Sequence, residues 1–293
     1  MKPHLLILPT ILALAMPAMA EDESLKIEGA PDPVEVAKDV AGPDGGVPDD
    51  LRDDAHLQEE LAVNKFTAPS ISRMFDTLQF LMPLPIAEVK RKMPARMSQD
   101  RADLAIELGF LIADGFLMVQ AESLENVEQM AKDLTRYGKA LGTTDRVTRH
   151  SASLLENAKA GNVAQLKSEL ASTQRDVEDE LVSLRDADLA HLISLGGWIR
   201  ALEVATVAVD KQFSPERARK VMRQDIAEYY ADCLTGLDPR ISGRPNYSAM
   251  HTVLEGLSVK MTLAEGQDPT PESMKEIRKT AAQLVELALK RQE

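Results

Sequence analysis

The chain has 293 residues, of which 44% are hydrophobic and 4% aromatic, and its formal net charge is −13. A single cysteine, Cys233, excludes an intramolecular disulfide and any metal site built from cysteines, and we expect it to be a buried, inert thiol. The negative charge is concentrated in residues 21–60, which hold fourteen acidic and three basic residues. The rest of the chain is nearly neutral and has no basic face that would bind nucleic acid.

Residues 1–20 have the pattern of a secretory signal peptide. A short basic lead is followed by the apolar run 5–16 and by Ala18-Met19-Ala20, a small-residue ending of the kind that signal peptidases cleave. The apolar run is too short to span a bilayer, and no cysteine stands at the cleavage point to carry a lipid. We therefore expect cleavage after Ala20 and a periplasmic or secreted mature chain without a membrane span.

Residues 21–55 are predicted to be a disordered acidic linker. Glycine and proline interrupt every possible helix between 21 and 50, and aromatic residues are absent there. Such a segment cannot bury enough apolar surface to offset the entropy lost on ordering. We expect residues 56–293 to form a single folded domain.

The composition of that domain, rich in Ala, Leu, Glu, Lys, Arg and Met, predicts an all-α fold, either a helical bundle or a short α-hairpin solenoid. Ser214-Pro215-Glu216 and Thr270-Pro271-Glu272 are the strongest helix starts, because proline suits the first helical position and glutamate suits the positive end of the helix dipole. The stretch 162–210 is the most strongly helical, with leucines and valines on one face. Weaker helix starts are predicted at Ser70, Ser98, Thr144 and Asn162.

A weak internal repeat relates three apolar helices. Gly109, Gly196 and Gly256 end similar tetrapeptides, Ile-Glu-Leu-Gly, Ile-Ser-Leu-Gly and Val-Leu-Glu-Gly, and a second helix start comes 14 or 18 residues later. We interpret these segments as three related α-hairpins. Glycine inside a helix costs about 1 kcal/mol relative to alanine, so these positions predict close approach of neighbouring helices.

Two histidines occupy the same position relative to these glycines. His191 and His251 each lie five residues before a glycine of the repeat, and Asp188 lies one turn from His191. If the hairpins pack in register, two imidazoles and a carboxylate can hold a divalent metal. The alternative is that both are surface histidines or hydrogen-bonded core histidines. The chain lacks the Glu-x-x-His pairs of di-iron bundles and the Cys-x-x-Cys-His of covalent haem sites.

Four charged residues interrupt otherwise apolar helices: Asp114, Arg200, Glu203 and Lys260. Charges inside apolar runs are costly unless they are paired. We expect either a buried polar cluster of ion pairs that fixes helix register, with Arg200 and Glu203 one turn apart, or a pocket for a polar ligand beside Trp198.

These features favour a non-catalytic binding or interaction module with a protein or small-molecule partner. Signatures of nucleophile elbows, phosphate loops, dinucleotide sites and zinc proteases are absent from the sequence, and we expect no cofactor. One alternative is a metal- or cofactor-carrying bundle that uses His191 and His251. A hydrolytic enzyme working through paired carboxylates such as Asp114 and Glu203 has no spacing argument behind it.

Overall fold

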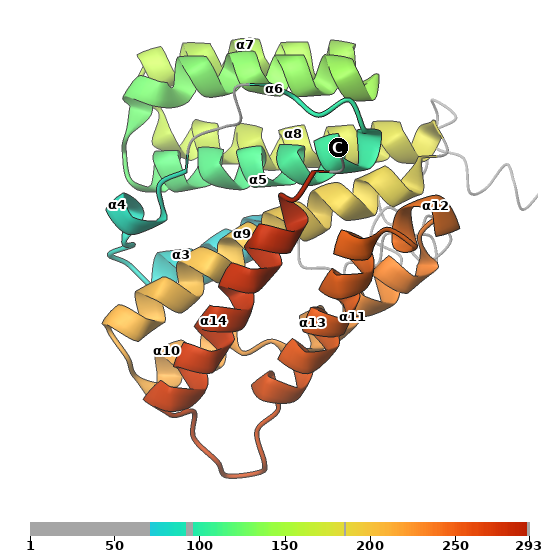
Figure 1. The fold of residues 1–293 in the computed structure, drawn as a ribbon. Helices are drawn as coiled ribbons and strands as arrows, with labels where there is room; N and C mark the ends of the chain where they lie inside the picture. Colours follow the sequence, from blue (N-terminus) through green and yellow to red (C-terminus); the bar gives the residue numbers. More distant parts are fainter. Residues whose placement is uncertain (1–70, 92–95, 185, 292–293) are drawn as a thin grey trace, which may run out of the picture. The chain divides into compact units, whose positions relative to one another are not determined.

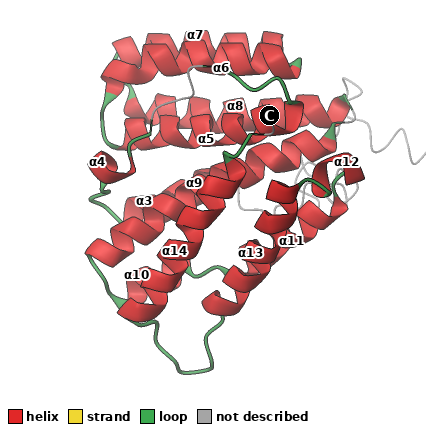
Figure 2. Cartoon of the chain, viewed as in Figure 1, coloured by secondary structure: helices red, strands yellow, loops and turns green. Residues whose placement is uncertain are grey.

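The computed structural model describes residues 71–91, 96–184 and 186–291, and within these ranges the chain forms helices and loops without a strand (Figures 1 and 2). The predicted all-α class is therefore confirmed. The signal peptide at 1–20, the linker at 21–55 and the start of the predicted domain lie outside the described residues. All described residues belong to one compact unit, Asp53–Glu293.

The described helices follow one another with short connections, most of them of two to six residues. Their bounds are α3 Ile71–Phe80, α4 Ile86–Val89, α5 Arg101–Gln120, the 3₁₀ helix η1 Leu124–Asn126, α6 Val127–Leu141, α7 Thr144–Lys159, α8 Val163–Ser183, α9 Ala187–Lys211, α10 Pro215–Val221, α11 Gln224–Gly236, α12 Pro239–Ser242, α13 Pro245–Met261 and α14 Pro271–Ala288.

Helices α5 to α8 form a four-helix bundle. Each packs against the next along the chain, and α8 packs back against α5, which closes the ring. In Figure 1, α6 and α7 lie above α5 and α8. Short loops between consecutive helices make each neighbour antiparallel, as in up-and-down bundles. The fold is thus of the bundle type predicted from composition.

Helix α9 is the central helix of the described unit. It packs against α5 and α8 of the bundle on one side and against α3 and α14 on another, while α11, α13 and α14 pack against one another in sequence (Figure 1). Its length and hydropathy would suffice for a membrane span, but 89% of its most apolar stretch is buried by neighbouring helices. Contacts on several sides explain why α9 is apolar around most of its circumference.

The helix caps show how local sequence sets the boundaries. Ser214 and Thr270 cap their helices as predicted: the Ser214 hydroxyl accepts a hydrogen bond from the backbone N–H of Arg217, and the Thr270 hydroxyl accepts one from that of Ser273. The Ser273 side chain bonds back to the Thr270 backbone N–H and completes a capping box. At α5 the prediction was off by two residues, because the Asp100 carboxylate, and not Ser98, accepts from the first backbone N–H groups. A carboxylate there is stabilised by the helix dipole.

The glycines of the repeat have two different environments. At the crossing of α5 and α9, a Cβ on Gly109 would overlap the carbonyl oxygen of Ile193, and a Cβ on Gly196 would overlap that of Ile106. The two helices therefore touch backbone to backbone, as predicted. For Gly256 the prediction of close approach was wrong, because no atom of another element lies within 4 Å of the position of its Cβ.

Candidate ligand pocket

A buried arginine connects α5, α9 and the end of α4. Arg200 lies in the middle of α9 and is 1% exposed. Its Nε donates to Asp114 Oδ1 at 2.7 Å, and its Nη1 donates to Glu203 Oε2 at 2.6 Å. Its Nη2 donates to the backbone carbonyl oxygen of Val89. All three nitrogens are engaged, as a buried guanidinium requires.

A second arginine completes the charge balance of this cluster. The Arg91 guanidinium lies over the ring of Phe110, 5.0 Å from its centroid, and its Nη1 is 3.8 Å from Glu203 Oε2. Burial raises the pKa of the Asp114 carboxyl despite the attraction of Arg200, and burial lowers the pKa of the Arg91 guanidinium despite the attraction of Glu203. Two cations and two carboxylates thus offset one another where each alone would be costly.

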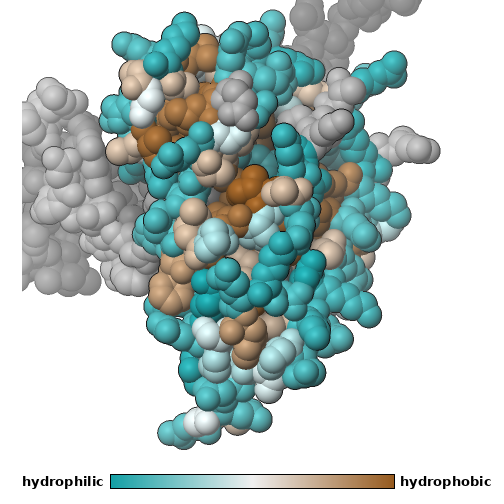
Figure 3. Space-filling view, turned by 90° about the vertical axis from the view of Figure 1, so that its left-hand side faces the viewer, coloured by the Kyte–Doolittle hydropathy of each residue, from teal (hydrophilic) through white to brown (hydrophobic). Residues whose placement is uncertain are grey.

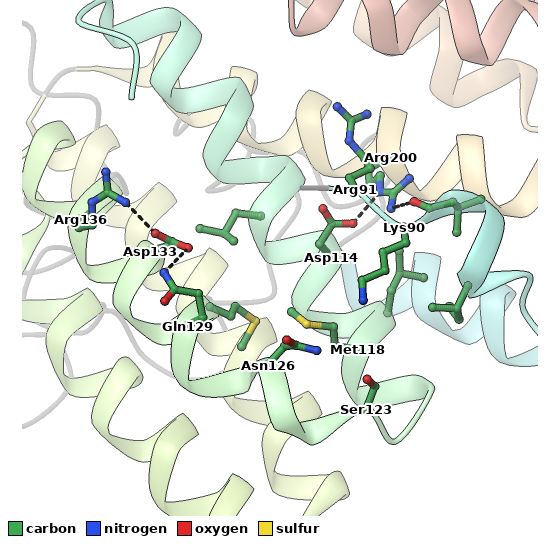
Figure 4. Close-up of a pocket in the computed structure, with 15 residues that line it drawn as sticks. Lys90, Arg91, Asp114, Met118, Ser123, Asn126, Gln129, Asp133, Arg136 and Arg200 are labelled. Atoms are coloured by element: carbon green, nitrogen blue, oxygen red, sulfur yellow. Dashed lines mark hydrogen bonds and ion pairs between the residues drawn. The ribbon is translucent and has the colours of Figure 1, made fainter. Parts of the chain in front are cut away.

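A cavity of about 460 Å³ opens beside this cluster, between α4, α5, η1, α6 and α9 (Figure 4). This volume falls within the range of roughly 300–1,000 Å³ that is typical of small-molecule pockets. On the face that carries α4, hydrophobic residues are visible between hydrophilic ones (Figure 3). The apolar side chains that line the cavity are Ile86, Val89, Leu111, Leu117, Met118 and Met130.

The opposite wall of the pocket carries a second ion pair, on α6. Asp133 is 6% exposed and accepts hydrogen bonds from Gln129 Nε2 at 3.1 Å and from Arg136 Nη1 at 2.8 Å. Figure 4 shows these three side chains on the far side of the cavity from Arg91 and Arg200. Both charged walls therefore consist of paired groups, with apolar surface between them.

Lys90 differs from the other charged residues of the pocket. It follows α4 directly, is exposed, and lines the cavity. Figure 4 shows its side chain extending between Asp114 and Met118. Among the described residues, no carboxylate lies within ion-pair distance of its amine, whereas the other cations lining the pocket have acidic partners. Within the part of the chain that the structure describes, the pocket therefore offers one positive charge that is not paired with a carboxylate.

The structure does not bring the predicted metal ligands into one group. Asp188 accepts a hydrogen bond from the backbone N–H of Asp238 at 2.8 Å, and His251 Nδ1 lies 3.5 Å from Glu255 of its own helix. Burial lowers the pKa of the His191 imidazole. Within the described ranges, no cluster of three or more His, Cys, Asp or Glu residues is placed to hold a metal. The metal site stays a prediction without a supporting geometry.

Two other predicted features also lie apart from the pocket. Lys260 is exposed on α13 and donates from Nζ to Thr280 Oγ1 of α14 at 2.8 Å, so the predicted polar cluster comprises Asp114, Arg200 and Glu203 only. Trp198 lines a separate hollow of about 60 Å³, room for roughly two waters at about 30 Å³ each. Cys233 is half-buried, and burial raises the pKa of its thiol.

Sequence reasoning missed the pocket residues outside α5 and α9. Gln129, Asp133 and Arg136 stand at successive turns of an amphipathic helix, where polar residues at this spacing are typical of a solvated face. Lys90 lies in the connection between α4 and α5, and no motif in the sequence marks it. The one available signal was the row of polar residues on α6 beside Met130, which shares its pocket face.

Comparison with protein-family models, curated proteins and solved structures finds no match for this chain. Function must therefore be argued from the pocket itself. The pocket combines apolar walls, paired charges and, among the described residues, a lysine that is not in an ion pair.

Proposed function

We propose that the protein is a non-catalytic binding module that holds a small molecule in the pocket between α4, α5, α6 and α9. The observation that carries this proposal is the cavity of about 460 Å³ with mainly apolar walls. A pocket of this kind binds by burying the apolar surface of a ligand, while a few polar groups set its orientation.

The ion pairs of the pocket favour ligand binding over catalysis. A general acid or base needs to reach the substrate with a group whose proton can move. Here Asp114 is held by Arg200, and Asp133 is held by Arg136 and Gln129. Such ion pairs are suited to fixing the walls of a site, because each partner holds the other side chain in one geometry.

The test is native and denaturing mass spectrometry of the protein purified from its own source. We expect an added mass that is lost on denaturation. Met118→Trp should abolish this mass, because Met118 lines the pocket and is only half-buried, so a larger side chain can fill the cavity without disturbing the core. Met222→Trp is the matched control, since Met222 is also half-buried but does not line the pocket.

Two results of these mass measurements would refute the proposal. An added mass retained in Met118→Trp and lost in Met222→Trp would place the ligand elsewhere. A bare chain in both variants and in the parent protein, after purification that retains weakly bound ligands, would remove the support for a resident ligand. Thermal unfolding of each variant confirms that it is folded before the masses are compared.

We further propose that the protein is exported and acts outside the cytoplasm. The support is the basic lead, the apolar run 5–16 and the Ala18-Met19-Ala20 ending. The intact mass of the protein from its own source tests this proposal. A chain that begins at Glu21 is the expected result, and a chain that retains residues 1–20 would contradict it.

A further inference from the structure

The charges around the pocket do not cancel. Asp114 and Glu203 are balanced by Arg200 and Arg91, and on the opposite wall the charge of Asp133 is balanced by a salt bridge. Among the residues that the structure describes, Lys90 remains as one additional positive charge, at the exposed side of the pocket. This local excess contrasts with the chain as a whole, whose net charge is −13. Anion binding by this protein would therefore depend on a local group and not on its overall field.

The apolar walls lie directly behind this lysine. Leu111 and Leu117 are 2% and 4% exposed and form the inner part of the lining, while Met118 extends beside Lys90 (Figure 4). Methionine adapts its shape to irregular ligands, because its unbranched chain has three rotatable bonds and a polarizable sulfur. The pocket thus presents a positive charge at its mouth and adaptable apolar surface within.

We propose that the ligand is a small monoanionic amphiphile, whose acidic headgroup pairs with the Lys90 amine and whose apolar part lies against Leu117, Met118 and Met130. This assignment rests on the proposed function and specifies its ligand class. A neutral amphiphile would gain nothing from the charge of Lys90, and a cationic one would be repelled by Lys90 and the neighbouring Arg91. A larger anion is disfavoured because the cavity of about 460 Å³ holds roughly fifteen waters at about 30 Å³ each.

Three probes with alkyl chains of nine or ten carbons and different headgroups test this assignment by isothermal titration calorimetry: decanoate, decanol and decyltrimethylammonium. We expect decanoate to bind up to about fivefold more tightly than decanol, as for an ion pair at an exposed lysine, and the cation to bind weakest. Lys90→Met should abolish the preference for decanoate, since it keeps much of the apolar stem and removes the charge. Lys90→Arg should retain the preference. Because Lys90 is exposed, neither substitution should change thermal unfolding.

The outcomes separate this inference from the proposed function. Equal affinity for decanoate and decanol, with both lost in Met118→Trp, would overturn the anionic ligand class and leave the binding pocket in place. A preference for decanoate that persists in Lys90→Met would also overturn the role of the lysine. Absence of binding by all three probes to the parent protein would overturn the amphiphile and count against the proposed function itself.

Discussion

The crossing of α5 and α9 predicts a large and specific effect of adding one methyl group. A Cβ on Gly109 would overlap the carbonyl oxygen of Ile193 and lie 2.8 Å from the amide nitrogen of Gly197. A Cβ on Gly196 would overlap the carbonyl oxygen of Ile106 and lie 3.1 Å from its carbonyl carbon. These atoms belong to the backbone of rigid helices, so no side-chain rotation can make room.

Two opposing effects determine how much these alanine substitutions change the free energy of unfolding. Alanine is favoured over glycine in a helix interior by about 1 kcal/mol. Carbon atoms pack best at about 3.5–4.0 Å, so the helices would have to separate by about an ångström, and overpacking of this kind costs about 1–3 kcal/mol or more. We expect Gly109→Ala and Gly196→Ala each to lower the free energy of unfolding by about 2 kcal/mol, a large part of the roughly 5–15 kcal/mol of a typical domain.

Gly256→Ala is the matched control within the same chain. Gly256 lies inside α13, and its Cβ position has no neighbour within 4 Å. Because no steric overlap opposes it, the higher helix propensity of alanine should raise the free energy of unfolding by up to about 1 kcal/mol. Urea denaturation followed by circular dichroism measures all three variants. Stabilities of Gly109→Ala and Gly196→Ala equal to or above that of the parent would refute the close crossing of α5 and α9.

Three further substitutions test other parts of the structure by urea denaturation. Burial raises the pKa of the Glu178 carboxyl from 4.5 to about 8. The contribution of the neutral Glu178 side chain to the free energy of unfolding is therefore fully present below about pH 4.5 and is lost as the pH rises through about 8. Glu178→Gln should therefore be more stable than the parent at pH 9 by about 3 kcal/mol and should differ little from it at pH 4. Each pKa unit corresponds to about 1.4 kcal/mol, and the partial exposure of the side chain reduces the full effect. An equal difference at both pH values would contradict this prediction. Arg200→Met should cost about 3–5 kcal/mol because it leaves the Asp114 carboxylate buried without its partner, and adding Asp114→Leu should recover part of the loss. Thr270→Ala should cost about 1 kcal/mol by removing the capping box of α14, and an unchanged midpoint would show that the cap contributes nothing.

The sequence allowed the helical fold to be predicted where side chains act on their own backbone. Thr270 and Ser214 cap their helices because a hydroxyl and a following proline satisfy local requirements that do not depend on the rest of the chain. The stretch 162–210, predicted to be the most strongly helical, is divided near Leu184 into two helices. There α8 ends at Ser183, Leu184 is 51% exposed, and α9 starts at Ala187.

The pocket could be predicted only in part, for a physical reason. Asp114 and Arg200 were recognised because a charge inside an apolar helix is costly and must find a partner. Lys260 has the same sequence context but lies on the exposed side of α13, where a charge costs little. Lys90 and Asp133 come from a loop and an ordinary amphipathic helix, and only tertiary packing brings them to the same cavity.

The central claim is that a small ligand occupies the pocket between α4, α5, α6 and α9. Nuclear magnetic resonance of the protein with isotope-labelled methionine methyl groups tests this claim most directly, with decanoate and then decanol as probes. Met118 and Met130 line the cavity, whereas Met222 and Met274 do not. We expect saturable shifts of the Met118 and Met130 methyl resonances and none at Met222 or Met274. Shifts confined to the other methionines, or no shift with either probe, would contradict it.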